Sequence, residues 1–233
     1  MNSKTEFSGF PIEGLNFLKN LKNNNNREWF ENNRSIYNEY LIAPAQEFIM
    51  ILGQKLAAFI PDIRFDTRTN GSGSLMRIYR DIRFSPDKSP YKSYLGIGFW
   101  EGAGKRIDNP GFFIRIESHQ ATLYTGKYMF SKKNLDAYRN SVNDPDKGLK
   151  LEKILAHLRS TQIQEIGNVH YKRVPQGFDP EHERAELLKY NGMHTIFNPF
   201  PKTAVLSPDF VDLCLNSCKL TFDLHAWLME LTG

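Results

Sequence analysis

The apolar residues near the start of the chain recur at three- and four-residue steps, which is the period of an amphipathic helix. A first short helix is expected around residues 17–21 and should end at the asparagine run 23–26, because asparagine favours caps and turns. The same spacing over 27–60 predicts two further helices. Pro44 falls in the first turn of the second of these, where its missing N–H costs nothing, and Pro61 ends it.

The pattern then changes to alternation, with glycines between the apolar runs. Strands are expected near residues 63–68, 75–80, 95–101, 111–118 and 121–125, as a largely antiparallel meander. In the fourth run Phe112, Ile114 and Ile116 face one side of the sheet, while Arg115 faces the other. This half-buried alternation is typical of a sheet with helices over one face, and the helices at 27–60 are the expected cover.

The second half returns to helical spacing, with helices predicted at 131–143, 145–160, 179–190 and 207–231. Ser131 is a typical capping residue, and the pairs at 179–180 and 207–208 each join a capping side chain to a proline at the first helical position. The order of helices, strands and helices predicts an α+β fold. We expect a single domain over residues 1–233, with a mainly antiparallel sheet at about 63–125 covered by N-terminal and C-terminal helices.

The composition is that of an ordinary folded domain. Of the 233 residues, 40% are hydrophobic and 24% are charged, unlike disordered or fibrous sequences. No apolar run approaches the roughly 18–20 residues that cross a bilayer, and residues 1–9 are polar, so we expect neither membrane insertion nor a signal peptide. Cys214 and Cys218 are too few for a disulfide framework, and their spacing on the last helix predicts buried thiols. These features favour a cytoplasmic protein.

The formal net charge of +4 is concentrated in one part of the chain. Between Arg64 and Arg115 there are ten basic and five acidic residues, whereas the remaining positions hold 20 basic and 21 acidic residues. A local basic excess attracts anions, including phosphates, nucleotides, nucleic acids and acidic substrates, and says nothing about the fold.

The densest polar segment is RIYRDIRFSPDKSPYK at residues 77–92. If its strand stays extended through position 83, Arg77, Asp81 and Arg83 share one face, where two guanidinium groups beside a carboxylate can fork an anion. The alternative is a scaffold, in which Asp81 and Asp87 pair with these cations and hold a long loop on the sheet. The ligand-binding residues expected in this segment are Arg77, Arg80, Arg83, Asp87, Lys88, Tyr91 and Lys92.

Three segments resemble the family catalogued as domain of unknown function 2461. They are NNREWF at 25–30, the string R-x-x-R-D-x-R-F-S-x-D-K-S-P-Y-K at 77–92, and VPQGFDPEH at 174–182. The resemblance spans roughly residues 10 to 200, and the central string is long enough to be specific. It implies a shared module, and it implies no particular reaction, cofactor or catalytic residue.

A second polar cluster contains Lys172 and Arg173, which are further candidate ligand-binding residues, and His182. His182 lies in the first turn of the helix predicted at 179–190, where the positive end of the helix dipole disfavours protonation. A neutral imidazole there can act as a base or a ligand. The alternative is a histidine that caps or packs.

Other chemistry is not supported by the sequence. The six histidines form no H-x-x-x-H or H-E-x-x-H pair, so we expect no metal, and the common phosphate and dinucleotide loops are absent, so we expect no cofactor.

The leading hypothesis is a cytoplasmic domain that recognises a small anionic or phosphorylated ligand. If it is an enzyme of unknown reaction, Asp81 or His182 is the acid or base. A nucleic-acid-binding module ranks second, because the sequence pI of 8.9 lies below the value of about 9 that such domains exceed. A structural or protein-interaction domain ranks third, no membrane partner is expected, and the sequence does not define the oligomeric state.

Overall fold

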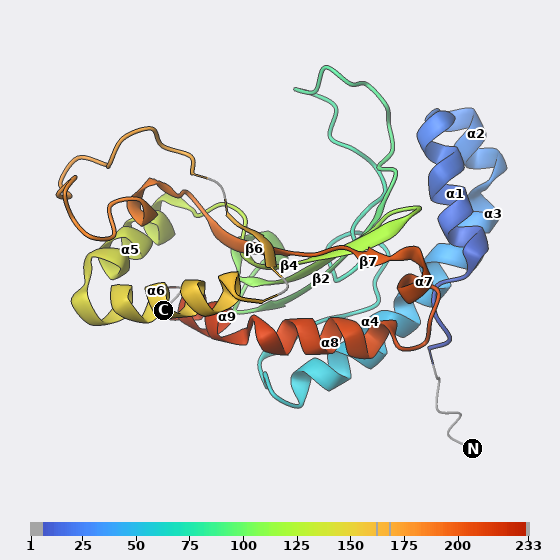
Figure 1. The fold of residues 1–233 in the computed structure, drawn as a ribbon. Helices are drawn as coiled ribbons and strands as arrows, with labels where there is room; N and C mark the ends of the chain where they lie inside the picture. The colour runs from blue at the N-terminus through green and yellow to red at the C-terminus, as the bar shows by residue number, and fades with distance from the viewer. Residues whose placement is uncertain (1–6, 162, 168, 232–233) are drawn as a thin grey trace. The chain divides into compact units, whose positions relative to one another are not determined.

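The computed structural model describes residues 7–161, 163–167 and 169–231, and it has an α+β fold (Figure 1). Within these residues the sheet has seven strands, in the order β1-β2-β3-β4-β6-β5, with β7 paired to β4. The predicted α+β class and the predicted antiparallel pairing are confirmed. Across the described ranges, no helix combines the length and the apolarity needed to cross a bilayer.

The chain packs into two compact units, each assembled from three segments. Unit 1 consists of Met1–Phe99, Phe113–Leu123 and Pro199–Asn216. Unit 2 consists of Trp100–Phe112, Tyr124–Asn198 and Ser217–Gly233. Neither unit is a continuous stretch of sequence.

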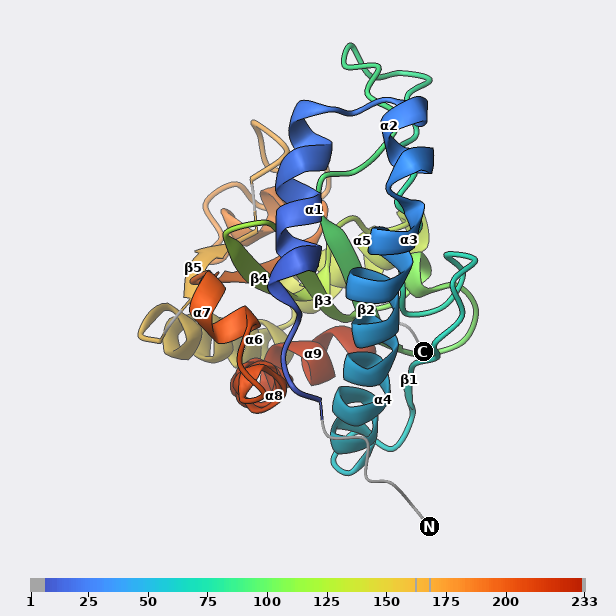
Figure 2. The same cartoon turned by 90° about the vertical axis from the view of Figure 1, so that its right-hand side faces the viewer.

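The helices of unit 1 include the N-terminal ones, which begin close to where the apolar spacing predicts, and a short one at residues 202–205, which was not predicted. They are α1 (Ile12–Asn23), α2 (Arg27–Asn32), α3 (Arg34–Tyr37), a π-helical turn η1 (Asn38–Ile42), α4 (Ala43–Ala57) and α7 (Lys202–Val205). The Asn26 side chain caps α2 by accepting the Trp29 N–H at 2.9 Å, and Pro44 lies in the first turn of α4 as predicted. Figure 2 shows α1 alongside α2 and α3.

The first strands follow the predicted meander, with differences in length. They are β1 (Ile63–Arg64), β2 (Leu95–Glu101), β3 (Gly111–Ile116) and β4 (Gln120–Lys127). β2 has the predicted bounds, and β3 alternates as predicted, with Phe112, Ile114 and Ile116 buried. The strand expected at 75–80 does not form. The backbone there makes only two isolated bridges, from Leu75 to Ile97 and from Tyr79 to Tyr91.

Aromatic rings fill much of the core of unit 1. Phe10 and Phe48 lie 5.7 Å apart between ring centroids, and Phe210 stacks on Phe48 at 5.4 Å. On α2, Phe30 stacks on Tyr91 at 4.3 Å with the rings inclined by 19°. This second contact joins α2 to the end of the 77–92 segment.

Unit 2 contains two helices that start as predicted. The Ser131 hydroxyl caps α5 (Lys132–Asn143), and the Asp144 carboxylate caps α6 (Pro145–Arg159), with Pro145 at its start. Unit 2 also holds two 3₁₀ turns, η2 (Arg106–Asp108) and η3 (Leu187–Lys189), and parts of β2, β3 and β4. Further elements with residues in this unit are β5 (Ile163–Ile166), β6 (Met193–Phe197), α8 (Phe210–Leu220) and α9 (Phe222–Met229).

The prediction of a helix at 179–190 is wrong. Successive bonds join residues three apart, such as His182 N–H to the Asp179 carbonyl and Ala185 N–H to the His182 carbonyl, so the chain makes tight turns that end in η3. Arg184 is buried within them, and its Nε donates to the Val142 carbonyl at 2.8 Å. This buried contact between Arg184 and α5 favours the turns over the helix that the local sequence of residues 179–190 predicts.

The prediction of a single helix at 207–231 is also wrong. The structure has two helices there, α8 (Phe210–Leu220) and α9 (Phe222–Met229), with a break at Thr221. The Thr221 hydroxyl donates to the Ser217 carbonyl at 3.0 Å, a back-bond that bends helices. The prediction of buried thiols is confirmed, since Cys214 and Cys218 are both fully buried and neither forms a disulfide. Burial raises the pKa of the Cys218 thiol.

Three strands were not predicted: β5, β6 and β7 (Phe200–Pro201). β6 pairs antiparallel with both β4 and β5, and β7 pairs with the start of β4. The sheet therefore extends beyond the expected residues 63–125 into the second half of the chain.

Candidate functional site

The two ends of the 77–92 segment run side by side in unit 1. The Arg80 N–H donates to the Pro90 carbonyl at 2.9 Å, and the Lys92 N–H donates to the Ile78 carbonyl at 2.7 Å. Between these ends, residues 81–89 form a loop and not a continued strand. The alternation assumed through position 83 therefore stops at Tyr79, which is bridged to Tyr91.

The loop is held together by its own side chains. Arg80 pairs with Asp87 and also donates to the Ser85 hydroxyl at 3.3 Å. Hydrogen bonds from Ser89, and then from Arg80, lower the pKa of Asp87 to about 2. Lys88 donates to the Ile82 carbonyl at 3.0 Å. Arg80 and Asp87 thus give the loop a fixed conformation.

The turn between α1 and α2 fixes the loop from outside. The Asn25 side-chain amide donates to the Tyr91 carbonyl at 2.9 Å, and the Asn25 side-chain oxygen accepts the Tyr91 N–H at 3.0 Å. Asn25 thereby pairs with the backbone as a neighbouring strand would. Together with the stack of Phe30 on Tyr91, it brings the end of α1 to the loop.

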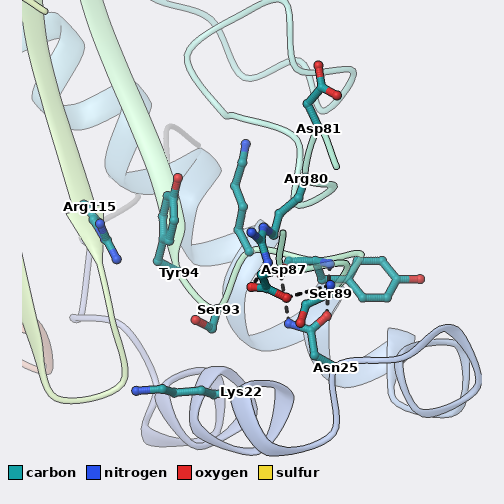
Figure 3. A pocket seen from close by; sticks show the side chains of 11 residues that line it. Lys22, Asn25, Arg80, Asp81, Asp87, Ser89, Ser93, Tyr94 and Arg115 are labelled. Carbon is teal, nitrogen blue, oxygen red and sulfur yellow. Dashed lines mark hydrogen bonds and ion pairs between the residues drawn. The ribbon is translucent and has the colours of Figure 1, made fainter. Parts of the chain in front are cut away.

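A cavity of about 610 Å³ lies where these parts meet (Figure 3). The residues that line it are Lys22, Asn25, Arg80, Asp81, Asp87, Ser89, Tyr91, Lys92, Ser93, Tyr94 and Arg115. Four of them are basic and two are acidic, so the lining has a formal charge of +2. The four cations come from α1, from the two ends of the 77–92 segment and from β3.

Arg115 and Tyr94 form one wall of this cationic cavity, side by side in Figure 3. The guanidinium carbon of Arg115 lies 4.2 Å from the centroid of the Tyr94 ring, and its Nη2 contacts the Glu117 carboxylate at 2.9 Å. The Arg115 Nε atom is buried with no hydrogen-bond partner in the described structure. The protein's own acceptors therefore leave one donor of this guanidinium unsatisfied.

The two lysines of the lining differ in their surroundings. Lys92 donates from Nζ to the Arg77 carbonyl at 2.8 Å. Lys22 lies on the last turn of α1 and is exposed, and no carboxylate in the described ranges forms an ion pair with it. Two ammonium groups thus add to the charge of the cavity.

Five of the residues predicted for the 77–92 segment line the cavity: Arg80, Asp81, Asp87, Tyr91 and Lys92. Arg77, Arg83 and Lys88 are exposed and are not among the lining residues. Arg83 instead binds Asp81 through two contacts of 2.9 and 2.7 Å, and these hydrogen bonds lower the pKa of Asp81 to about 2. A carboxylate with so low a pKa is a weak base at neutral pH.

The second predicted cluster belongs to unit 2. Lys172 and Arg173 are exposed there, and His182 is half-buried. The His182 Nδ1 accepts the Arg184 N–H at 3.0 Å, which is the capping role of the alternative interpretation. Because residues 179–186 form turns, the argument from a helix dipole at His182 no longer applies.

Sequence reasoning missed several lining residues: Lys22, Asn25, Ser93, Tyr94 and Arg115. One signal was available for Arg115, because it faces away from the core on β3 and ends the basic stretch that starts at Arg64. Lys22 and Asn25 lie far from the 77–92 segment in sequence, and no local pattern connects them to it.

Comparison with known proteins identifies one family. The family model described as a conserved hypothetical protein, domain of unknown function 2461, matches residues 13–227. No curated protein matches the chain. The matched range includes all three segments that carry the resemblance and most of both units of the structure. The chain therefore belongs to this family.

Proposed function

We propose that the cationic cavity of unit 1 binds a small anion, with a phosphate group as the best fit. The observation that carries the proposal is the convergence of Lys22, Arg80, Lys92 and Arg115 on one cavity from separate parts of unit 1. Like charges gathered in this way repel one another, and an anionic ligand relieves that repulsion.

The chemistry of the lining favours phosphate over a lipophilic ligand. Arginine forks a phosphate through two parallel N–H bonds, and lysine adds a compact charge. The Ser89 and Ser93 hydroxyls can donate to further oxygens. A volume of about 610 Å³ leaves room for more than the phosphate itself, so a phosphorylated small molecule fits the cavity.

The proposal is for binding and does not include a reaction. Asp81 is bound to Arg83 and keeps its charge at neutral pH, and His182 uses Nδ1 to accept a backbone hydrogen bond. Neither observation supports a general base. The buried thiols of Cys214 and Cys218 support a cytoplasmic location, which remains part of the proposal.

One observation favours the nucleic-acid alternative. Phe84, within the loop, is 92% exposed, and the Arg83 guanidinium carbon lies 5.8 Å from the centroid of its ring. Exposed aromatic rings next to arginines stack on the bases of single strands. This surface is distinct from the cavity lining, so Phe84→Ala should weaken oligonucleotide binding and leave phosphate binding unchanged.

The test is calorimetric titration with inorganic phosphate and pyrophosphate at constant ionic strength, with chloride as the reference anion. Arg115→Gln should weaken pyrophosphate binding by about 10- to 150-fold, because a charge-assisted hydrogen bond contributes about 1.5–3 kcal/mol. Lys22→Gln should weaken binding less, because the exposed ammonium group of Lys22 is a single point charge without the paired donors of arginine.

Arg77→Gln is the matched control, because it removes an exposed guanidinium from the 77–92 segment and Arg77 does not line the cavity. It should leave the affinity for pyrophosphate unchanged. Equal losses in Arg77→Gln and Arg115→Gln, or heats with phosphate no larger than with chloride, would refute the cavity as the anion site.

A further inference from the structure

A second cavity in unit 1 has the opposite chemistry. It has a volume of about 230 Å³ and lies between α1 and the helical segments α2, α3 and η1. Figure 2 shows α1 beside α2 and α3. Its lining includes Glu13 and no lysine, arginine or histidine. The aromatic residues Phe17, Trp29 and Tyr40 also line it. This aromatic cavity is separate from the cationic cavity, with which it shares no residue.

Helical spacing places the polar residues of the aromatic cavity on one face of α1. Glu13, Asn16 and Asn20 lie three and seven positions apart, so they follow one another along the face toward α2 and α3. All three side chains are exposed, and within the described ranges none makes a hydrogen bond or an ion pair. Their oxygen atoms are therefore available to a ligand.

Two elements that line the aromatic cavity, α1 and η1, approach each other closely through their backbones. A Cβ atom built on Gly14 would lie 2.3 Å from the Tyr40 carbonyl oxygen, so only glycine lets α1 pack this closely on η1. η1 is a π-helical turn, a local geometry often found at functional sites. It brings Tyr40 to the lining.

The aromatic wall is fixed before any ligand binds. The ring centroids of Phe17 and Trp29 lie 5.3 Å apart with the rings inclined by 39°. The Asn33 side-chain amide donates to the Trp29 carbonyl at 2.8 Å, and the Asn26 cap holds the Trp29 N–H. Rigid rings lose little entropy on binding, which favours affinity.

The charge near Tyr40 is negative. Glu39, through a hydrogen bond and its charge, raises the pKa of the Tyr40 hydroxyl, and the charge of Glu13 adds to this effect. Arg34, the nearby cation on α3, is paired with Glu31 at 2.6 Å and stacks over Phe30, and it does not line the cavity. A positive ligand would meet a carboxylate and aromatic faces there.

We propose that the aromatic cavity binds a small organic cation of the alkylated ammonium class. The faces of tryptophan, tyrosine and phenylalanine attract such cations through their quadrupoles, and a nearby carboxylate adds a full charge. An alkylated ammonium also buries methyl groups against Phe17 and Trp29, which a hydrated metal ion does not. The proposal is independent of anion binding in the cationic cavity.

The probe is choline, titrated while tryptophan emission is recorded. Trp29 is half-buried at the cavity, whereas Trp100 and Trp227 are buried elsewhere, so a change in emission reports on Trp29. We expect a saturable change at millimolar choline. The neutral isostere 3,3-dimethylbutan-1-ol has the same shape without the charge and should produce no saturable change.

Two charge variants locate the site. Glu13→Gln should weaken choline binding about fivefold, the loss expected for one charge contact about 4 Å away in water. Glu28→Gln, on the exposed surface of α2 and outside the lining, should leave it unchanged. Both positions are exposed, so neither substitution should affect folding.

The outcomes separate clearly. Choline binding that exceeds isostere binding, and that Glu13→Gln weakens more than Glu28→Gln, supports the proposal. Equal effects of the two glutamate variants, equal binding of choline and the isostere, or no binding of choline would overturn it. An unchanged choline-dependent emission signal in Trp29→Phe would also overturn it, because the signal would then come from Trp100 or Trp227.

Discussion

Replacing Asn25 with alanine should destabilise unit 1 more than its position on a surface turn suggests. The Asn25 side chain forms two hydrogen bonds with the backbone of Tyr91, one at 2.9 Å and one at 3.0 Å. Tyr91 is buried, so water cannot freely replace these bonds. The substitution therefore removes two bonds and leaves two backbone groups without partners.

The expected cost follows from these contacts. A hydrogen bond contributes about 1 kcal/mol, and a buried group left unsatisfied costs about 1–3 kcal/mol. Both bonds are only partly buried, so each loss lies at the low end of this range and the two together cost about 2–3 kcal/mol. For a chain of 150–250 residues, each kcal/mol lowers the melting temperature by about 2–4 °C. Asn25→Ala should therefore melt about 5–10 °C below the wild type.

The assay is thermal and urea unfolding, with Asn24→Ala as the matched control. The Asn24 amide donates only to the exposed Asn20 carbonyl, so its loss should change the melting temperature little. Asn25→Ala should also weaken pyrophosphate binding, because the 77–92 segment loses its contact with the α1–α2 turn. If Asn25→Ala is as stable as Asn24→Ala, the backbone pairing does not hold the loop in place.

Two further predictions concern a buried histidine and a packed glycine. Burial lowers the pKa of His225 below its usual 6.5, with Glu101, 2.7 Å from Nε2, opposing the shift, so the unfolded chain binds a proton that the folded chain resists. The free energy of unfolding should therefore fall as pH drops below 6.5. The urea midpoints measured at pH 7.5 and pH 5.5 should differ less in His225→Gln than in the wild type. Equal differences in the two proteins would contradict this prediction. Gly14→Ala should cost about 1–3 kcal/mol, because the new methyl group would lie 2.3 Å from the Tyr40 carbonyl oxygen. It should also weaken choline binding, and urea unfolding that matches the wild type would show that the two backbones can separate freely.

Local sequence signals were sufficient to predict the elements whose conformation depends mainly on their own residues. β2 could be predicted to its exact bounds from its apolar residues, and α5 begins where Ser131 offers a cap. β6 could not, because its strand conformation depends on pairing with β4, whose residues lie far away in sequence. Thr221 fits a helical pattern, and only its hydroxyl contacts with the preceding turn explain the break between α8 and α9.

The candidate site divides in the same way. The composition of the 77–92 segment identified Arg80 and Lys92, which line the cationic cavity. It could not show that Arg83 pairs with Asp81, because the loop departs from the extended geometry that the alternation assumes. Lys22 joins them only because α1 is held near the loop by contacts distant in sequence.

The discontinuous path of the chain through unit 1 also affects its synthesis on the ribosome. Phe210, which stacks on Phe48 in the core, belongs to the segment Pro199–Asn216, the last part of unit 1 to be translated. Until that segment leaves the exit tunnel, Phe48 and Phe10 lack the covering ring of Phe210 and expose apolar surface. A nascent chain that stalls before residue 199 is therefore a substrate for chaperones and proteases, although it already carries every residue of the cationic cavity.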